Sequence, residues 1–167
     1  MIEIIIANIL NLVSGICSII STQGKEKKQI VFIEFIGSVL RVIQAALVKS
    51  WSDLIAKVIK IITQFLTLEG KLTKRVFVII SVLYTVLCTY IAYISKDVRC
   101  FVAIIPSLME FYALLEASTK KYRSYIIITK TLWIINNIIF QLYVGIVFDL
   151  IVIIGHLFKI KKTKIEV

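Results

Sequence analysis

The strongest constraint on this chain is that apolar segments long enough to cross a lipid bilayer recur from one end to the other. A spanning helix needs about 20 mostly apolar residues. The chain has 167 residues, of which 59% are hydrophobic and 18% are charged. The sequence therefore predicts an all-α integral membrane protein with about seven spans and no separate water-soluble domain.

The limits of the spans follow from hydropathy. The apolar run from Tyr125 to Phe158 is too long for one crossing, and we divide it near Gln141–Gly145, where Gln and Gly weaken the pattern. The first run contains Glu3 and lacks a basic leader, so we expect it to stay as a helix rather than to be cleaved as a signal. The seven predicted spans are Ile2–Ser21, Ile30–Val48, Trp51–Leu68, Val76–Ser95, Cys100–Ala117, Tyr125–Phe140 and Leu142–Phe158.

Basic residues alternate between the loops. Lys and Arg near the ends of spans favour the cytoplasmic side. One set of loops contains few basic residues, namely Lys49, Lys96 and Arg99, and we expect it outside with the N-terminus. The loops rich in basic residues and the C-terminus should be cytoplasmic. The basic residues of this second set are Lys25, Lys27, Lys28, Lys71, Lys74, Arg75, Lys120, Lys121, Arg123, Lys159, Lys161, Lys162 and Lys164.

The same distribution explains the net charge of +10. A basic balance often indicates a nucleic-acid partner, but here the excess is spread over four short segments, as topology requires. We expect no nucleic-acid binding, and only unspecific contact with anionic headgroups of the lipid bilayer. The sequence leaves a homo-oligomer open.

A shift of 92 residues superimposes the first three predicted spans on the last three without a gap. Lys28 falls on Lys120, and Gln44 falls on Asn136. We therefore predict two parallel three-helix bundles, residues 1–71 and 99–167, joined by a linker helix within residues 72–98. This 3+1+3 arrangement is the pattern of SWEET-type carriers, in which parallel repeats form the two halves.

Two interruptions coincide in this alignment. Ser14-Gly15 falls on Pro106-Ser107. Pro106 removes a backbone hydrogen bond from its helix, and corresponding Gly or Pro interruptions in two halves point to a transporter site. We predict a gating role for Gly15 and Pro106, although Gly and Pro are also simply commoner in membrane helices.

Eight ionisable residues lie within the predicted spans. A charge at the centre of a spanning helix costs about 2.5–3.5 kcal/mol on insertion scales, so such residues should face the interior or each other. Arg41, Glu110 and Asp149 lie nearer mid-depth, where we expect pairing across helices, and for Arg41 and Asp149 we favour a polar interior pathway. For Lys57 and Lys60 we favour a structural or snorkelling role. The others are Glu34, which shares a stripe with Arg41, and Asp53 and Lys130, which lie nearer the interfaces, where we expect snorkelling.

Amide side chains form a second group. Gln44 faces Asn136 and Asn137 under the repeat, and amides offer both donors and acceptors to a polar ligand. Interhelical hydrogen bonding is the alternative role. Asn8, Asn11, Ser14 and Ser18 form a polar stripe on the first helix.

From Pro106 onward the chain resembles the YgjV family of bacterial inner-membrane proteins. The matching features are Pro106, Ala113-Leu114, the basic loop Lys120–Arg123, the segment Leu132-Trp133-Ile134-Ile135-Asn136-Asn137, Gly145, Asp149 and the basic tail. The resemblance implies the bacterial inner membrane and, through distant similarity to SWEET, PQ-loop and PnuC-type carriers, the 3+1+3 fold. It brings no established substrate.

No enzyme constellation is present. The single histidine, His156, has no nearby Cys or acidic ligand set and should be an interfacial side chain near the end of the last helix. No phosphate-cradling Gly-rich loop occurs, so we expect neither an enzyme nor a cofactor or metal site.

The sequence therefore predicts a facilitative or ion-coupled carrier of a small polar solute. The predicted substrate-binding residues are Gln44, Asn136, Asn137, Arg41, Glu110 and Asp149. The alternative is a non-transporting membrane protein, such as an immunity, sensing or assembly factor.

Overall fold

A computed structural model describes residues 2–47, 51–96, 99–139 and 143–165. These parts of the chain contain seven α-helices and no strand, as the sequence predicts for an all-α protein. The helices are α1 (Ile2–Ser21), α2 (Lys27–Leu47), α3 (Trp51–Leu68), α4 (Lys74–Ser95), α5 (Arg99–Ala113), α6 (Thr119–Ile139) and α7 (Tyr143–Ile165).

The helix limits agree with the hydropathy limits for α1 and α3 and differ for the last three helices. α5 ends at Ala113 rather than Ala117, where Leu114 N donates to Phe111 O in a closing turn. α6 begins at Thr119, well before the predicted Tyr125, and α7 continues through the basic tail. Hydropathy marks only the apolar part of a helix, whereas Lys and Arg are good helix formers that extend it.

The predicted break in the last apolar run is confirmed in outline. α6 ends at Ile139 and α7 begins at Tyr143. Gln141, one end of the predicted break, lies outside the described residues, and Gly145 lies within α7.

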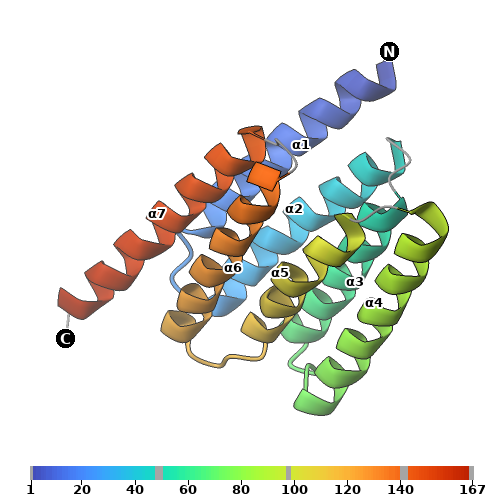
Figure 1. The fold of residues 1–167 in the computed structure, drawn as a ribbon. Helices are drawn as coiled ribbons and strands as arrows, with labels where there is room; N and C mark the ends of the chain where they lie inside the picture. The colour runs from blue at the N-terminus through green and yellow to red at the C-terminus, as the bar shows by residue number, and fades with distance from the viewer. Residues whose placement is uncertain (1, 48–50, 97–98, 140–142, 166–167) are drawn as a thin grey trace.

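The helices lie side by side along one direction, with the N- and C-termini at opposite ends of the bundle (Figure 1). Each helix packs against the next in the sequence, α1 also packs against α7, and α3 also packs against α5. The contacts α1–α2–α3–α5–α6–α7–α1 therefore close a ring of six helices, and α4 lies outside it against α3 and α5. The turns after α1, α3 and α5 lie at the same end as the C-terminus (Figure 1).

Helix boundaries recur at the interval found in the sequence. α2 and α6 have 21 residues each, and their first residues, Lys27 and Thr119, are 92 positions apart. The same shift relates the C-terminal residues of α1 and α5 and the first residues of α3 and α7. Under this shift α1 corresponds to α5 and α3 corresponds to α7, so the α1–α7 contact corresponds to the α3–α5 contact.

The distribution of side chains is inverted relative to a water-soluble protein. Large apolar side chains cover the outside, and on α4 Ile79 is 66% exposed and Tyr93 is 82% exposed. Charged side chains such as Lys60 and Glu110 lie inside. Within the described residues two helices, over Lys27–Leu47 and Lys74–Ile94, are long and apolar enough to qualify as membrane spans by themselves. An apolar exterior around a charged interior is the arrangement that a lipid solvent favours.

Glycine allows close approach between helices at two points in the ring. A Cβ atom on Gly15 of α1 would lie 2.6 Å from the ring of Phe148 on α7, and one on Gly155 of α7 would lie 2.6 Å from Thr22 Oγ1. Small residues at helix contacts are typical of packing in membranes. The predicted gating role of Gly15 stays a prediction, because its position also has this packing role.

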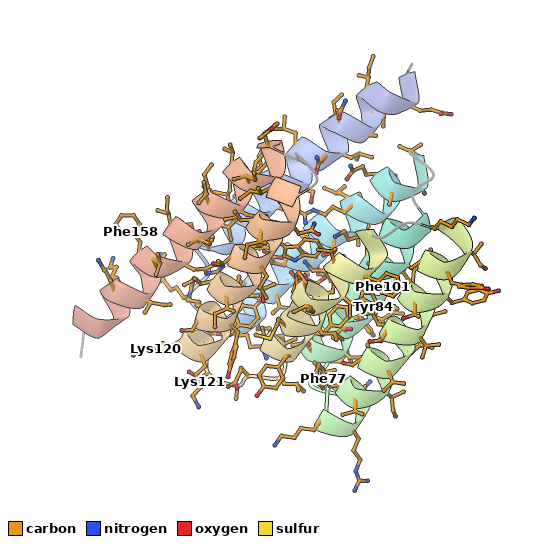
Figure 2. The ribbon with its side chains drawn as sticks, viewed as in Figure 1. Phe77, Tyr84, Phe101, Lys120, Lys121 and Phe158 are labelled. Carbon is orange, nitrogen blue, oxygen red and sulfur yellow. The ribbon has the colours of Figure 1, made fainter. Side chains whose placement is uncertain are left out.

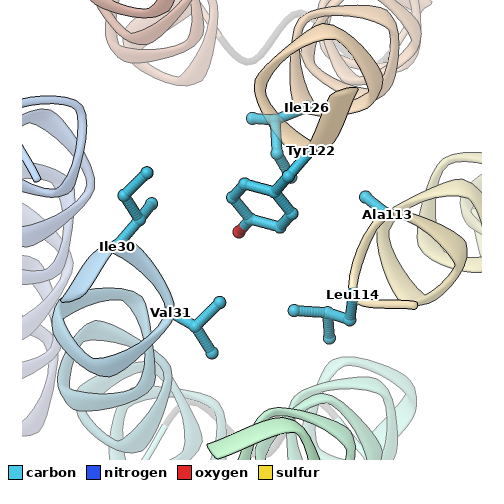
Figure 3. Packing of buried hydrophobic residues seen from close by; sticks show 6 residues of the cluster. All are labelled: Ile30, Val31, Ala113, Leu114, Tyr122 and Ile126. Carbon is cyan, nitrogen blue, oxygen red and sulfur yellow. The ribbon is translucent and has the colours of Figure 1, made fainter. Parts of the chain in front are cut away.

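Six buried residues, which we call the apolar plug, gather between the helices of the ring (Figure 3). They come from α2, the end of α5 and the first turns of α6, with the ring of Tyr122 between the others. Lys27 connects these segments, because its Nζ donates to Leu114 O at 2.6 Å and its backbone N donates to Thr119 Oγ1 at 3.1 Å. The members of the plug are Ile30, Val31, Ala113, Leu114, Tyr122 and Ile126.

Aromatic contacts hold α4 to α5. Tyr84 is fully buried against Phe111 with ring centroids 5.3 Å apart in an edge-to-face arrangement. Its hydroxyl donates to Ser107 Oγ at 2.9 Å, next to Pro106. Figure 2 shows Tyr84 directed from α4 towards α5. α5 continues as a helix through Pro106, which lies inside it.

Candidate functional site in the helix ring

Lys60 of α3 is the centre of a buried group of charges. Its Nζ lies 2.6 Å from Glu110 Oε1 on α5 and 3.5 Å from Glu34 Oε2 on α2. Ser21 of α1 donates its hydroxyl to the other oxygen of Glu34, Oε1, at 3.0 Å. All four side chains are buried, so one ammonium group joins two carboxylates in surroundings that screen charge weakly.

A second ion pair lies between α6 and α7. Lys130 Nζ lies 3.0 Å from Asp149 Oδ1, and Asn137 Nδ2 donates to Asp149 Oδ2 at 3.1 Å. A Cβ atom on Gly145 would lie 2.7 Å from Asn137 Nδ2. Gly145 and Asp149 are one turn apart on α7, so the missing side chain of Gly145 leaves room for the amide that binds Asp149.

We call these seven residues the polar network. They come from all six helices of the ring and comprise three carboxylates and two ammonium groups. Glu34 is one turn from Ile30, Glu110 is one turn from Leu114, and Lys130 is one turn from Ile126, so the network lies next to the apolar plug. The members are Ser21, Glu34, Lys60, Glu110, Lys130, Asn137 and Asp149.

Arg41 is half-buried and interacts with α1. Its Nε donates to Ser14 Oγ at 2.6 Å, and its NH2 donates to Ser18 Oγ at 3.5 Å. The polar stripe of the first helix is therefore divided: Ser14 and Ser18 bind Arg41, whereas Asn8 and Asn11 are exposed. This contact fixes α1 against α2.

The predicted facing amides are only partly brought together. Among the described residues no hydrogen bond joins Gln44, which is half-buried, to Asn136. Asn136 Oδ1 is buried and has no hydrogen-bond partner in the described parts of the chain. The same is true of Gln64 Oε1 and Thr129 Oγ1. Buried acceptors in this condition are available to the donors of a bound molecule.

The predictions for three lysines need separate accounts. Snorkelling is wrong for Lys60 and Lys130, because they are 5% and 4% exposed and pair with carboxylates inside the ring. Lys57 Nζ lies 5.3 Å from the centre of the Trp133 ring, a cation–π contact between α3 and α6. The side chain of Asp53 lies outside the described residues.

The prediction that His156 is an interfacial side chain is also wrong. His156 is fully buried, and its Nδ1 accepts a hydrogen bond from Arg123 NH1 at 2.9 Å. Arg123 also donates to Thr22 O at 2.9 Å and to Gly24 O. A ring nitrogen that accepts from a guanidinium is unprotonated, so His156 is neutral here. Arg123, taken from sequence as a loop residue, thus joins the end of α1 to α7.

Within the residues that the structure describes, no three His, Cys, Asp or Glu side chains gather as a set of metal ligands. The carboxylates of the polar network instead face ammonium groups and hydroxyl or amide donors.

The apolar exterior, the helical ring and the buried charges define an integral membrane protein. The chain belongs to the Imp-YgjV family, described as bacterial inner membrane protein, which matches residues 5–166. The resemblance noted from Pro106 onward is thereby confirmed and extends over nearly the whole chain. No curated protein matches the chain, and no solved structure matches it.

Proposed function

We propose that this protein is a facilitative or ion-coupled carrier of a small polar solute across the bacterial inner membrane. The observation that carries the proposal is the ion pair between Lys60 of α3 and Glu110 of α5, 2.6 Å apart and buried. Under the 3+1+3 arrangement these helices belong to different bundles. A rocking motion of one bundle against the other then breaks and remakes this contact, which couples the charges to opening of the ring.

The 3+1+3 arrangement is itself part of the proposal. The recurrence of helix boundaries at 92 residues supports two equivalent bundles, α1–α3 and α5–α7, with α4 as the linker. Termini at opposite ends of the bundle support an odd number of crossings (Figure 1). The lysine-rich turns then face the cytoplasm, and the N-terminus lies outside, as in SWEET-type or PnuC-type carriers.

Topology is tested by tagging each end of the chain. A reporter that is active only outside the inner membrane should work at the N-terminus and fail at the C-terminus, and a cytoplasmic reporter should give the reverse. A second insertion at Gly70, which is exposed in the turn between α3 and α4, should behave like the C-terminus. Both ends reporting the same compartment would contradict the two-bundle arrangement.

Gating follows from the position of the apolar plug. In this proposal the apolar plug closes the ring between the polar network and the lysine-rich turns, because its members lie in the first turns of α2 and α6 and at the end of α5. Gly15 and Pro106 supply the local freedom for opening in this proposal, one in each bundle.

Solute binding is assigned to Gln44, Arg41, Glu110, Asn136, Asn137 and Asp149. Asn136 is the residue with the most direct support for contact with a solute, because its buried Oδ1 lacks a partner among the described residues. A hydroxyl or amide of the solute would donate to it. The two roles considered for Asn136 make different predictions about stability: loss of an interhelical hydrogen bond destabilises the fold, whereas removal of an unpartnered acceptor is nearly neutral.

We expect Asn136→Ala to abolish flux while leaving stability within about 1 kcal/mol of the wild type. Purified protein is reconstituted into liposomes, and uptake is measured for small sugars, vitamins and amino-acid derivatives, with thermal unfolding measured in detergent. Ile138→Ala is the matched control, because Ile138 lies on the same helix and is 59% exposed on the apolar outside. It should retain wild-type flux.

Absence of flux for every solute, together with destabilisation by Asn136→Ala, would contradict the carrier proposal. That result would favour a non-transporting membrane protein in which the polar network only fixes the register of the helices.

A further inference from the structure

A basic pocket lies at the lysine-rich end of the molecule, apart from the polar network. Its volume is about 420 Å³, within the range of ligand sites. Three segments form it: the turn after α1, the first turns of α6 and the last turns of α7. The lining residues are Gly24, Lys25, Thr119, Lys120, Arg123, Lys159, Ile160 and Lys162.

The charge of this pocket selects anions. Five of the eight lining residues are basic and none is acidic, which is more positive charge in one concavity than topology alone requires. Topology needs basic residues on one side of the membrane, but it does not need them to converge from three segments.

Arg123 places a positive charge at a fixed position in the lining of the pocket. It is 4% exposed, and its guanidinium is held by Thr22 O, Gly24 O and His156 Nδ1. A planar guanidinium held in one orientation is suited to phosphate oxygens.

The outer surface of α7 shows which phosphate compound fits. Ile151, Ile154 and Phe158 are 40%, 51% and 70% exposed, and with Lys162 they follow one face of the helix at steps of three and four residues. Phe158 projects outwards from α7 in Figure 2. An apolar stripe therefore leads along the lipid-facing side directly to the basic pocket.

We propose that this pocket is a specific site for an anionic phospholipid, with the phosphates in the pocket and an acyl chain along Ile151, Ile154 and Phe158. Several lysines and one arginine match a headgroup with two phosphates, such as that of cardiolipin. This replaces the unspecific headgroup contact expected from the sequence, and it holds whether or not the protein is a carrier.

The test compares two double variants with equal loss of charge. Lys120→Gln with Lys162→Gln removes pocket residues, whereas Lys121→Gln with Lys161→Gln removes exposed neighbours on the same helices that do not line the pocket. Binding of cardiolipin and of phosphatidylcholine to the full chain in neutral detergent is measured by native mass spectrometry. Thermal unfolding checks that all variants remain folded.

We expect the wild type to prefer cardiolipin, the pocket variant to bind it about 30-fold more weakly, at about 1 kcal/mol per basic residue, and the neighbouring variant to bind like the wild type. Equal losses in both variants would overturn the proposal in favour of general surface potential. Tight binding of inorganic pyrophosphate without preference for cardiolipin over phosphatidylcholine would overturn it in favour of a soluble anion.

Discussion

Lys60→Met should destabilise the folded protein by about 3–5 kcal/mol, because it leaves two buried carboxylates, Glu34 and Glu110, without their shared counter-ion. Methionine has a similar length and fills the same space, so the loss reports on charge rather than on a cavity. Unfolding of the purified protein in mixed micelles, followed by tryptophan fluorescence, measures the change.

Two controls separate charge from packing in this experiment. Lys71→Met removes an exposed lysine that pairs with Glu69 at 3.5 Å, and it should change stability by less than about 1 kcal/mol. Adding Glu34→Gln and Glu110→Gln to Lys60→Met should recover most of the loss, because no uncompensated charge remains. A single Lys60→Met variant as stable as Lys71→Met would show that these charges are not a buried ion-paired unit.

Arg123→Leu should cost about 3 kcal/mol of stability, the second largest effect that we expect. The substitution removes hydrogen bonds to Thr22 O, Gly24 O and His156 Nδ1 and leaves two buried or partly buried carbonyl groups without a donor. The packing of α1 against α7 should loosen first, since Arg123 connects the end of α1 to α7. Hydrogen exchange at the C-terminal end of α1 gives a local measurement beside the global unfolding.

Conservative replacement sharpens this prediction. Arg123→Lys keeps the charge but cannot reach three acceptors in one plane, so it should recover less than half of the loss. Lys121→Leu, two residues earlier on the exposed side of α6, should stay within about 0.5 kcal/mol of the wild type. Equal stability of Arg123→Leu and Lys121→Leu would contradict the structural role of Arg123.

The helices are predictable from the sequence because each contains a long, mostly apolar stretch. Ile2–Ser21 and Trp51–Leu68 have the predicted limits, and the break before Tyr143 is where the apolar pattern weakens. Hydropathy measures only the part of a helix that avoids water, so it does not reveal that α6 begins at Thr119. The interval of 92 residues is visible in the sequence because helix boundaries recur at this spacing, as at the first residues of α2 and α6.

The candidate site is predictable in part. Glu110, Asn137 and Asp149 were expected to line the interior and belong to the polar network. The sequence assigned Lys60 only a structural or snorkelling role and did not reveal its partners, because its ion pairs with Glu34 and Glu110 connect residues 26 and 50 positions away. Spacing along one helix does not show such contacts. The sequence does contain one signal for the inner face of α3, which is a set of polar residues three and four positions apart. These residues are Lys60, Thr63, Gln64 and Thr67.

The cluster around Arg123 could not be found in this way. Basic residues near a span satisfy topology whether they face water or pack inward, so the sequence does not separate Arg123 from Lys121. His156 gives no periodic signal because it is a single residue. Only the approach of α1, α6 and α7 brings its Nδ1 within reach of the guanidinium.

The apolar outer face of α4 has a consequence for how this chain tolerates change. Hydrocarbon tails are fluid and adapt to any outline, so Ile79, Val82 or Val86 can exchange with other oily side chains at little cost. The side chains on that face must stay apolar, but no neighbouring protein surface within the described residues constrains their shape. Substitutions between apolar residues should therefore be tolerated over that surface but not at Tyr84, where α4 packs against α5.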